Sequence, residues 1–554
     1  MRSFARHAIV VLAFPSIAAA QARMSPSDSL VRGIDRVFDA WRDTHGPGCA
    51  VGVSRDGRTI VERGYGMANL ETGTPIEPAS IFHVASVSKQ FTAAAIMLLA
   101  RDGMLSVDDN IRKYLPEIPD YGTPITIRHL LTHTSGLRDQ WSLLYLARGR
   151  FEEDRITEAD VMDIVPRQKA LNFTPGAEYL YSNTGFTLLG VIVRRVTGQS
   201  LKDFAAARIF APLGMTHTHF HDDYTMLVPG RAAAYEPVDG GRGWRVGIPN
   251  FDVYGATSLF TTVGDLLKWE ANFETPVVGD AAMLSKMQMP TPLTGGDTSS
   301  YAFGLQLGTY RGAKLVEHNG ADAGYRAYVG RFPELRTAIA IECNGATANT
   351  TALARGVADV VLRDRLGRVQ QTAAPKAAVT LSPAQLSRRA GVYVQPTTLQ
   401  VLELSMRDGS LILGQQTGPA LIPLSDDRFR VSGGPAELVF ANGEHSGFRR
   451  VAPDARDVAY EWRERVTPTR AALNAFAGRY ISEELGGVVY RVIATDSTLE
   501  LATGTSRPLS AHPVFANTFV TDGFTIQFDV AHGRGTGFEA TESRMRKVKF
   551  VRVP

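Results

Sequence analysis

Cysteine is scarce in this chain, with only Cys49 and Cys343 among 554 residues. Neither has other ligand residues near it at the spacing of a metal site, so we expect no metal ion. Both lie in apolar runs that predict strands. The residues alone leave two alternatives equally open, a pair of buried free thiols and a disulfide bridge.

An excess of charge of one sign is also missing. Lys and Arg number 59 and Asp and Glu 56, which leaves a net charge of +3. This balance gives no reason to expect a nucleic-acid partner. Beyond the first 22 residues no stretch is long and apolar enough to span a bilayer, so no permanent membrane span is expected.

The first 22 residues have the pattern of a secretory signal peptide. Arg2 and Arg6 precede an apolar run over residues 8–20, and small residues suitable for cleavage lie at 18–20 or 20–22. The apolar run is shorter than a membrane-spanning helix requires. We therefore expect a periplasmic or secreted protein, with an uncleaved anchor as the alternative.

A chain of 554 residues is too long for one core, and residues 23–367 predict an α+β domain. Two apolar runs flank an Asp-Gly turn and predict a hairpin over 48–64. Helices are predicted over 84–100, 182–197 and 352–366, and strands over 314–318, 325–332 and 337–344. Strands at both ends of this segment favour one sheet that unites them.

The sequence changes character after residue 367. Residues 368–382 are polar with Ala and Pro and predict a linker. Beyond it, short strands dominate, and the pattern Leu-x-x-x-Ala-Gly-x-Tyr occurs at 386–393 and again at 473–480. This repeat predicts two small antiparallel β-barrels of the up-and-down, lipocalin-like type over 383–466 and 467–554. A single larger sandwich is the alternative.

The sequence Ser86-Val87-Ser88-Lys89 opens the first long helix and is the only Ser-x-x-Lys in the chain. Residues three apart lie on one face of a helix, so the hydroxyl of Ser86 and the amine of Lys89 are within reach of each other. The N-terminus of the helix adds positive potential where an oxyanion would form. This combination is typical of acyl transfer through a serine nucleophile.

Three further segments add chemistry to this motif. Tyr-Ser-Asn at 181–183 begins a helix, and Tyr181 can take or return a proton if a nearby cation lowers its pKa. His-Asn-Gly at 318–320 ends a predicted strand, where His318 is titratable and Gly320 lets a substrate lie close to the backbone. The third is the loop Leu-Thr-His-Thr-Ser-Gly-Leu at 131–137, preceded by Leu130.

Together these segments resemble the class C β-lactamase-like, penicillin-binding-protein-like serine hydrolases, which include D-aminopeptidases, carboxylesterases, D,D-carboxypeptidases and β-lactamases. The resemblance runs from about residue 46 to 344. It also takes in Gly-Tyr-Gly at 64–66, Phe-Thr at 91–92, Pro-Leu-Gly-Met at 212–215 and Ser-Leu-Phe-Thr-Thr at 258–262 with Asp265. It implies an antiparallel sheet with helices on both sides and a helical subdomain.

The resemblance also implies roles for the residues. Ser86 would be the acylated nucleophile. Lys89 would either hold Tyr181 partly as phenolate or act as the neutral base itself, and Tyr181 would protonate the leaving group. Asn183 would bind a substrate amide and steady Lys89. The backbone N–H groups of Ser86 and Ala321 would form the oxyanion hole.

Residues 318–320 depart from the β-lactamase pattern. β-Lactamases place Lys-Thr-Gly there, and that lysine pairs with the carboxylate of the antibiotic. A histidine is mostly neutral at pH 7, so His318 should hold penicillins and cephalosporins poorly. We expect His318 to be catalytic and Asn319, Gly320 and Ala321 to bind substrate, with no cofactor.

The resemblance bears on the cysteines as well. In this fold the first strand of the sheet pairs with the last, which places Cys49 beside Cys343. We predict that their Cα atoms lie within about 7 Å, the reach of a disulfide.

Other polar residues have plainer interpretations. His217, His219 and His221 alternate, but a polar surface turn is favoured over a metal site. His133 is interpreted as a loop-stabilising hydrogen bonder, and Asp322 as a solvated turn residue with contact to a substrate ammonium as the alternative.

The two predicted barrels resemble the layout of bacterial D-aminopeptidases, in which a barrel loop reaches into the cleft. We therefore predict an exported aminopeptidase or amidase that acts on D-amino-acid amides or short peptides. A carboxylesterase of the same fold is the second hypothesis, and a catalytically silent binding protein is the third. The expected partner is a small peptide, amide or ester substrate, and a homo-oligomer is compatible with the sequence.

Overall fold

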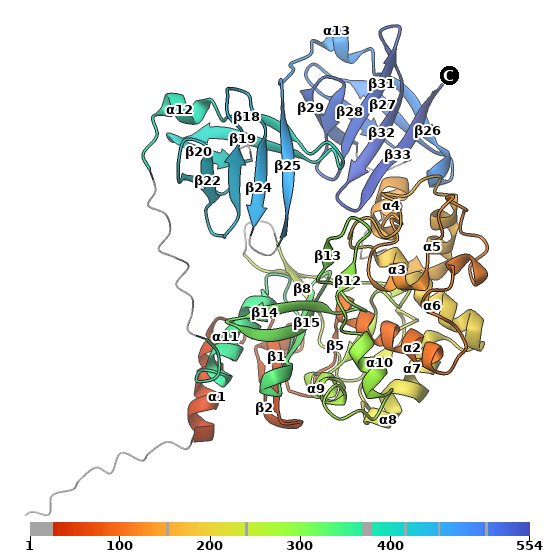
Figure 1. Ribbon diagram of the computed structural model, residues 1–554, viewed down its shortest axis with the longest axis vertical. Coiled ribbons are helices and arrows are strands. Elements are labelled where there is room, and N and C mark those ends of the chain that lie inside the picture. The colour runs from red at the N-terminus through yellow and green to blue at the C-terminus, as the bar shows by residue number, and fades with distance from the viewer. Residues whose placement is uncertain are drawn as a thin grey trace, which may run out of the picture.

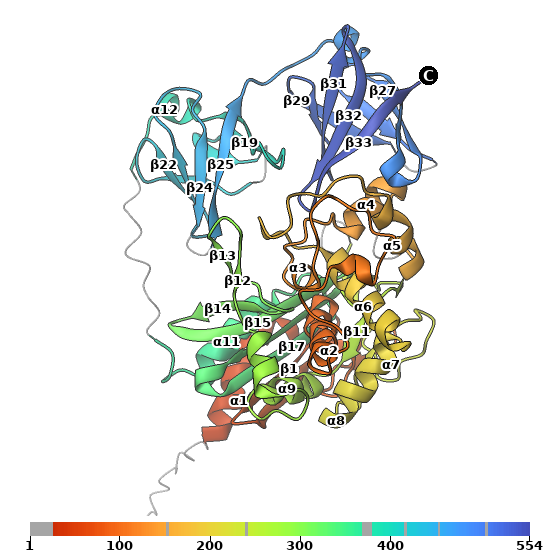
Figure 2. The same cartoon turned by 45° about the vertical axis from the view of Figure 1, so that its right-hand side comes forward.

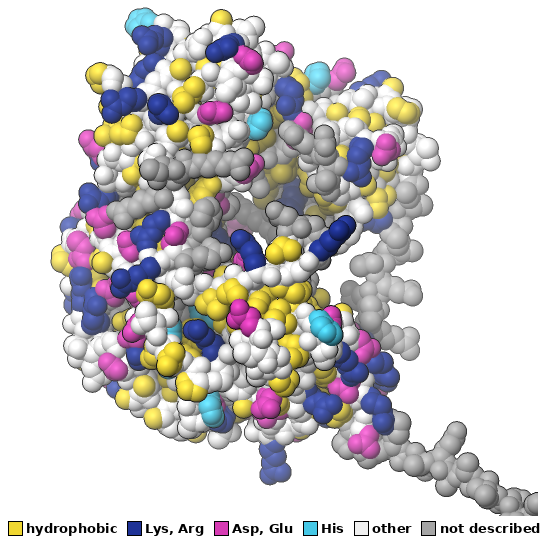
Figure 3. Space-filling model, turned by 180° about the vertical axis from the view of Figure 1, so that it is seen from behind, with side chains coloured by type: hydrophobic (Ala, Val, Ile, Leu, Met, Phe, Trp, Pro, Cys, Tyr) yellow, Lys and Arg dark blue, Asp and Glu magenta, His cyan; other side chains and the backbone are white. Residues whose placement is uncertain are grey.

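The computed structural model describes residues 26–150, 154–238, 242–367, 379–414, 418–452, 455–504 and 508–554. The predicted signal peptide and residues 368–378 of the predicted linker lie outside these ranges. Within them, no helix has the length and apolar character needed to cross a membrane. From behind, acidic and basic side chains are interspersed over the face in view, in agreement with the balanced net charge (Figure 3).

The N-terminal part is built on a six-stranded antiparallel sheet with the order β14-β15-β16-β17-β1-β2. The predicted hairpin and the three predicted strands are present, and the sheet joins both ends of this part as expected. The strands are β1 Cys49–Arg55, β2 Arg58–Tyr65, β14 Gln306–Tyr310, β15 Ala313–Asp322, β16 Tyr325–Phe332 and β17 Thr337–Cys343.

Strand β15 differs from the prediction, which ended it at His318. It continues to Asp322 because Asn319 to Asp322 pair with Tyr325 to Tyr328 of β16. Asn-Gly is a common turn sequence, but here cross-strand pairing overrides that local preference. Strand β14 was not predicted.

Helices cover both faces of the sheet, as the resemblance implied (Figure 1). Alternate residues of a strand point to opposite faces. Accordingly Val51 and Val53 pack in one hydrophobic cluster with α1 Pro26–Val37 and α11 Thr350–Val361. Ala50 faces the other cluster, which contains α9 Val263–Asn272.

The helical subdomain places the catalytic segments. Its main helices are α2 Lys89–Arg101, α3 Ile127–Leu131, α4 Gln140–Arg148, α5 Glu158–Ile164 and α6 Asn183–Thr197. Helix α2 is buried over residues 89–99 and packs against α6, which packs in turn against α3. The two predicted helices over 84–100 and 182–197 are confirmed, except that the first turn, Ala85–Ser88, is a 3₁₀ helix.

The predicted disulfide is present. Cys49 and Cys343 are register partners of β1 and β17, both are fully buried, and they form a disulfide with a Cα–Cα distance of 4.0 Å. The prediction of Cα atoms within about 7 Å is confirmed, and the alternative of two free thiols is wrong.

The C-terminal part contains two separate eight-stranded antiparallel sheets rather than one sandwich (Figure 1). The second is a closed barrel; in the first, an isolated bridge pairs Ile412 in one edge strand with Ala420, the residue just before the other edge strand. The first comprises β18 Gly391–Val394, β19 Val401–Arg407, β20 Ser410–Leu413, β21 Leu421–Pro423, β22 Arg428–Val431, β23 Glu437–Phe440, β24 Phe448–Ala452 and β25 Ala455–Arg463. The second comprises β26 Gly478–Ser482, β27 Val488–Ala494, β28 Leu499–Ala502, β29 Leu509–Phe515, β30 Thr518–Val520, β31 Thr525–Ala531, β32 Arg534–Glu542 and β33 Met545–Val553.

The sequence repeat corresponds to the start of each barrel. A short helix, α12 Pro383–Ser387 or α13 Arg470–Leu473, leads into the first strand. The repeated tyrosine then donates a hydrogen bond back to a carbonyl four residues earlier, Tyr393 to Arg389 and Tyr480 to Phe476. The domain boundaries at 367, 382 and 466 stay predictions.

The second barrel rests on the helical subdomain beside α4 and α5 (Figures 1 and 2). One hydrophobic cluster runs from the core of the N-terminal part into this barrel. The segment after β26, Glu483–Leu485, contacts α4. The turn between β32 and β33 therefore lies close to the loop that precedes α4.

Candidate active site

Ser86 lies in a tight turn at the start of α2. Ala85 before it has a positive φ of 47°, a conformation that non-glycine residues rarely adopt. Strand β15 packs against this turn: a Cβ atom at Gly320 would lie 2.2 Å from the carbonyl oxygen of Val84 and 3.1 Å from the backbone nitrogen of Ser86. Glycine is required at 320 because the nucleophile's own backbone occupies the space of a side chain.

The Lys89 amine is completely buried beneath the nucleophile. Its Nζ donates to Ser86 Oγ at 3.0 Å, to Asn183 Oδ1 at 2.9 Å and to the carbonyl oxygen of Ala256 at 2.7 Å. Burial is the main cause that lowers the pKa of Lys89 to about 7. A substantial fraction of this amine is therefore neutral at pH 7 and able to accept the Ser86 proton.

Two basic side chains contact the ring of Tyr181. Lys89 Nζ and Arg544 Cζ are each 4.8 Å from the centroid of its ring. Its hydroxyl is buried and has no hydrogen-bond partner by geometry among the described residues. Burial raises the pKa of Tyr181 far more than the nearby Ser86 hydroxyl lowers it. This opposes a phenolate and favours the alternative in which Lys89 is the base.

Asn183 is held by a carboxylate that sequence reasoning missed. Buried Asp139 Oδ2 accepts from the backbone N–H of Asn183 at 2.6 Å and from its amide Nδ2 at 2.9 Å. The amide oxygen of Asn183 is thereby turned toward Lys89. Asp139 also caps α4 by accepting from the backbone N–H of Trp141. The only sequence feature that could have pointed to Asp139 is its position two residues after the Leu-Thr-His-Thr-Ser-Gly-Leu loop.

His318 is buried and both ring nitrogens are engaged. Nδ1 lies 2.6 Å from the carbonyl oxygen of Asn319, which requires a proton on Nδ1 and leaves Nε2 to accept from the hydroxyl of Tyr301 at 2.9 Å. Burial, with the charge of Lys89, lowers the pKa of His318 to about 4. The lowered pKa favours a neutral ring at pH 7, and the contacts of His318 place it in the cavity wall beside Tyr181.

One cavity of about 470 Å³ brings most of the predicted site together. It is lined by Ser86, Tyr181, Asn183, Asn319, Gly320 and Ala321, and also by Trp141, Tyr179, Asp322 and Arg544. Lys89 lies behind Ser86. His318 lines an adjoining cavity of about 270 Å³ with Tyr179, Tyr181 and Tyr301.

Arg544 comes from the β32–β33 turn of the second barrel, so a barrel segment does enter the site. Its backbone carbonyl accepts from the N–H of Asp139 at 3.1 Å. No local motif marks this arginine, which is 405 residues from Asp139 in sequence and reaches it only through the fold.

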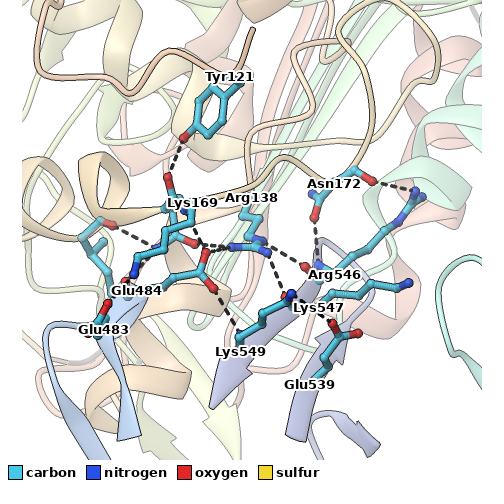
Figure 4. A network of polar contacts seen from close by, with 12 residues as sticks. Tyr121, Arg138, Lys169, Asn172, Glu483, Glu484, Glu539, Arg546, Lys547 and Lys549 are labelled. Atoms are coloured by element: carbon cyan, nitrogen blue, oxygen red, sulfur yellow. Dashed lines mark hydrogen bonds and ion pairs between the residues drawn. The ribbon is translucent and has the colours of Figure 1, made fainter. Parts of the chain in front are cut away.

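A buried ion pair next to Asp139 anchors this turn (Figure 4). Arg138 donates to Glu484 Oε1 at 2.7 Å, and the two side chains are 1% and 5% exposed. Arg138 also donates to the backbone carbonyls of Arg546 at 2.9 Å and Lys547 at 3.0 Å. The helical subdomain thus holds the barrel turn through one guanidinium.

Three other histidines contact neighbouring backbone or side chains. His133 Nδ1 accepts from the backbone N–H of Ser182, and its ring packs tilted against that of Tyr181 with the centroids 4.1 Å apart, as expected of a loop-stabilising residue. His219 and His221 face each other at 3.3 Å. Among the described residues no group of three or more metal-ligating side chains occurs.

A serine and a buried amine in contact, with a tyrosine beside them in a cavity edged by β15, define a serine acyl-transfer enzyme. Residues 34–362 match the family model described as Beta-lactamase, and the chain belongs to that family. It is 28% identical over 407 residues to a D-aminopeptidase of Cereibacter sphaeroides, covering 72% of this chain and 73% of the relative. It is 29% identical to penicillin-binding protein 4* of Bacillus subtilis, covering 74% and 94%.

Solved structures share the fold. An octameric penicillin-binding protein homologue from Pyrococcus abyssi aligns with a TM-score of 0.56 at 22% identity, covering 79% of this chain and all of that one. A D-amino acid amidase from Ochrobactrum anthropi SV3 aligns with a TM-score of 0.51 at 24% identity, covering 61% and 99%. The protein is a serine hydrolase of the β-lactamase fold, followed by two barrel-like sheets.

Proposed function

We propose that this hydrolase is an exported aminopeptidase or amidase that acts on D-amino-acid amides or short peptides through an acyl-enzyme on Ser86. The carrying observation is the fully buried Lys89, whose Nζ contacts Ser86 Oγ behind a cavity that Arg544 of a barrel turn also lines. A cavity of about 470 Å³ suits small substrates. The D-aminopeptidases among its relatives support the substrate class.

The proposed reaction begins with neutral Lys89, which takes the hydroxyl proton as Ser86 Oγ forms a bond to the substrate carbonyl carbon. The backbone N–H groups of Ser86 and Ala321 stabilise the oxyanion. Tyr181 gives its proton to the leaving nitrogen as the C–N bond breaks, and recovers one from Lys89. The amine departs and leaves an ester on Ser86.

Deacylation reverses these roles. Tyr181 takes a proton from water as the water oxygen attacks the ester carbon, and passes its own hydroxyl proton to neutral Lys89. Lys89 then gives that proton to Ser86 Oγ as the bond between Oγ and the acyl carbon breaks. The unpartnered Tyr181 hydroxyl fits a group that acts only when substrate or water is present.

A parallel assay tests the substrate class. D-alanine p-nitroanilide, L-alanine p-nitroanilide, p-nitrophenyl acetate and a chromogenic cephalosporin are offered to the wild type and to Ser86→Ala. We expect the D-anilide to be cleaved fastest and every activity to be lost in Ser86→Ala. Fastest turnover of the acetate would indicate the carboxylesterase, and fastest turnover of the cephalosporin would refute the argument from His318.

A fluorophosphonate probe tests the catalytic class independently of substrate. Labelling of the wild type but not of Ser86→Ala is expected, whereas an unlabelled, folded wild type would indicate a binding protein. Export is tested by N-terminal sequencing of the mature protein, which we expect to begin at residue 21 or 23.

A further inference from the structure

Arg544 presents a charge to the space where a substrate would lie. The Arg544 side chain contacts the ring of Tyr181 and is exposed, whereas Lys89, which contacts the same ring, is fully buried. Arg544 and Trp141 line the cavity that contains Ser86. They also line a second, adjoining cavity of about 720 Å³. The guanidinium therefore stands where the two cavities meet, on the accessible side of Tyr181.

Glu542, Asp139 and Asp322 line a cavity together with Arg544, and each has another partner; Asp322 accepts from the hydroxyl of Thr257. Glu542 accepts from the hydroxyl of Ser142 and from the backbone N–H of Arg544 itself. Asp139 is bonded to Asn183. Over the described ranges the Arg544 guanidinium forms no ion pair with a carboxylate, and its contact is the face of the Tyr181 ring.

The turn that carries Arg544 is fixed rather than free. Arg138 donates to the carbonyls of Arg546 and Lys547 (Figure 4). The backbone N–H of Asp139 donates to the carbonyl of Arg544. A guanidinium on an anchored turn loses little conformational freedom when it binds an anion. Its planar donors match a carboxylate, which it can hold with two parallel hydrogen bonds.

We propose that Arg544 is the receptor for a carboxylate on the substrate, and that the preferred substrates are short peptides with a free α-carboxylate on the residue that leaves. This rests on the proposed function, in which Tyr181 protonates the leaving nitrogen. Arg544 lies against the ring of that same tyrosine, so an anion bound to it belongs to the leaving group. The second barrel thereby supplies the cation that is missing at His318.

The test compares D-phenylalanyl-D-alanine with its C-terminal amide, which differ in the carboxylate alone. We expect the wild type to have a higher kcat/KM for the free acid, and Arg544→Gln to lower the acid-to-amide ratio by about 10-fold to 100-fold. Arg544→Lys should retain part of the preference. The matched control is Lys547→Gln, which removes the same charge three residues away and should leave the ratio unchanged. An equal loss on both substrates, or an unchanged ratio in Arg544→Gln, overturns the proposal.

Binding to the Ser86→Ala variant separates this proposal from the proposed function. Calorimetry on that variant needs no turnover, so it remains informative if neither peptide is cleaved. Tighter binding of the acid than of the amide, lost when Arg544→Gln is added, supports the carboxylate receptor even if the peptidase activity fails. Equal binding of acid and amide, or no detectable binding of either, overturns it.

Discussion

Glutamates 483 and 484 are adjacent in sequence but differ in burial, and this difference makes a sharp prediction about how the second barrel is held. Glu484 is 5% exposed and pairs with the 1% exposed Arg138, whereas the Glu483 side chain is 74% exposed and pairs with Lys169 at the surface (Figure 4). Substituting each glutamate by glutamine removes one charge and keeps the shape.

The expected magnitudes follow from burial. Glu484→Gln leaves the Arg138 guanidinium buried without a counter-charge, and removing one partner of a buried pair costs about 3–5 kcal/mol. A glutamine oxygen in the place of Oε1 still accepts from Arg138 and from the backbone N–H of Lys169, and only the bond from the Lys549 N–H to Oε2 is lost. This places the loss of unfolding free energy near the lower end, about 3 kcal/mol. Glu483→Gln should have no measurable effect, because exposed pairs contribute little.

Thermal unfolding of the full chain measures the difference. We expect Glu484→Gln to lower the midpoint by roughly 5 °C or more, and Glu483→Gln to leave it unchanged. Fluorophosphonate labelling of Ser86 should slow in Glu484→Gln, because Arg138 is adjacent to Asp139, which positions Asn183. Equal midpoints and labelling rates for the two variants would refute the anchoring of the barrel by this pair.

The dependence of stability on pH in the acid range gives a second check on the pair. Burial raises the pKa of Glu484, but Arg138 and the backbone N–H groups of Lys169 and Lys549 lower it below its usual value. A carboxylate with a lowered pKa stabilises the fold above its unfolded pKa and loses this contribution as pH falls. The stability difference between wild type and Glu484→Gln should therefore shrink below about pH 4.5.

Three further predictions follow from the site and the core. Asp139→Asn should reduce kcat by 10-fold or more with little change in KM, because Asn183 would no longer be held toward Lys89; equal changes in both constants would contradict a positioning role. Since burial lowers the pKa of Lys89 to about 7, kcat/KM should rise with pH through about 7 and then level, and a profile flat from pH 5 to 9 would exclude a neutral lysine base. Replacing Cys49 and Cys343 together by alanine should lower the unfolding free energy by about 2–4 kcal/mol without loss of activity at 25 °C, as measured by chemical denaturation; unchanged stability would contradict a stabilising bridge.

The residues that do chemistry were predictable because chemistry restricts their type and spacing. Ser86 and Tyr181 were singled out from motifs, and Asn183 and Ala321 from the family resemblance; all four line one cavity. The pairing of Cys49 with Cys343 followed from the family fold and is confirmed.

The residues that hold this chemistry in place were not predictable in the same way. Asp139 and Arg138 act through hydrogen bonds to distant segments, and a local sequence pattern does not encode such contacts. Arg544 belongs to an ordinary turn of a barrel and becomes significant only where that turn meets the cavity. Strand β15 was predicted too short because Asn319-Gly320 is a turn sequence whose preference yields to cross-strand pairing.

The position of β1 beside β17 has a consequence for the order of folding. The first strand of the sheet finds this neighbour 294 residues later, at the register of Cys49 and Cys343. Contacts so distant in sequence form slowly, and a growing chain cannot make them before both segments exist. The turn of Ser86 packs against β15 and so also waits for the distal strands. A nascent chain that ends before residue 320 therefore lacks a completed nucleophile site, and hydrolytic activity should arise late in synthesis, after most of the catalytic sequence has been made.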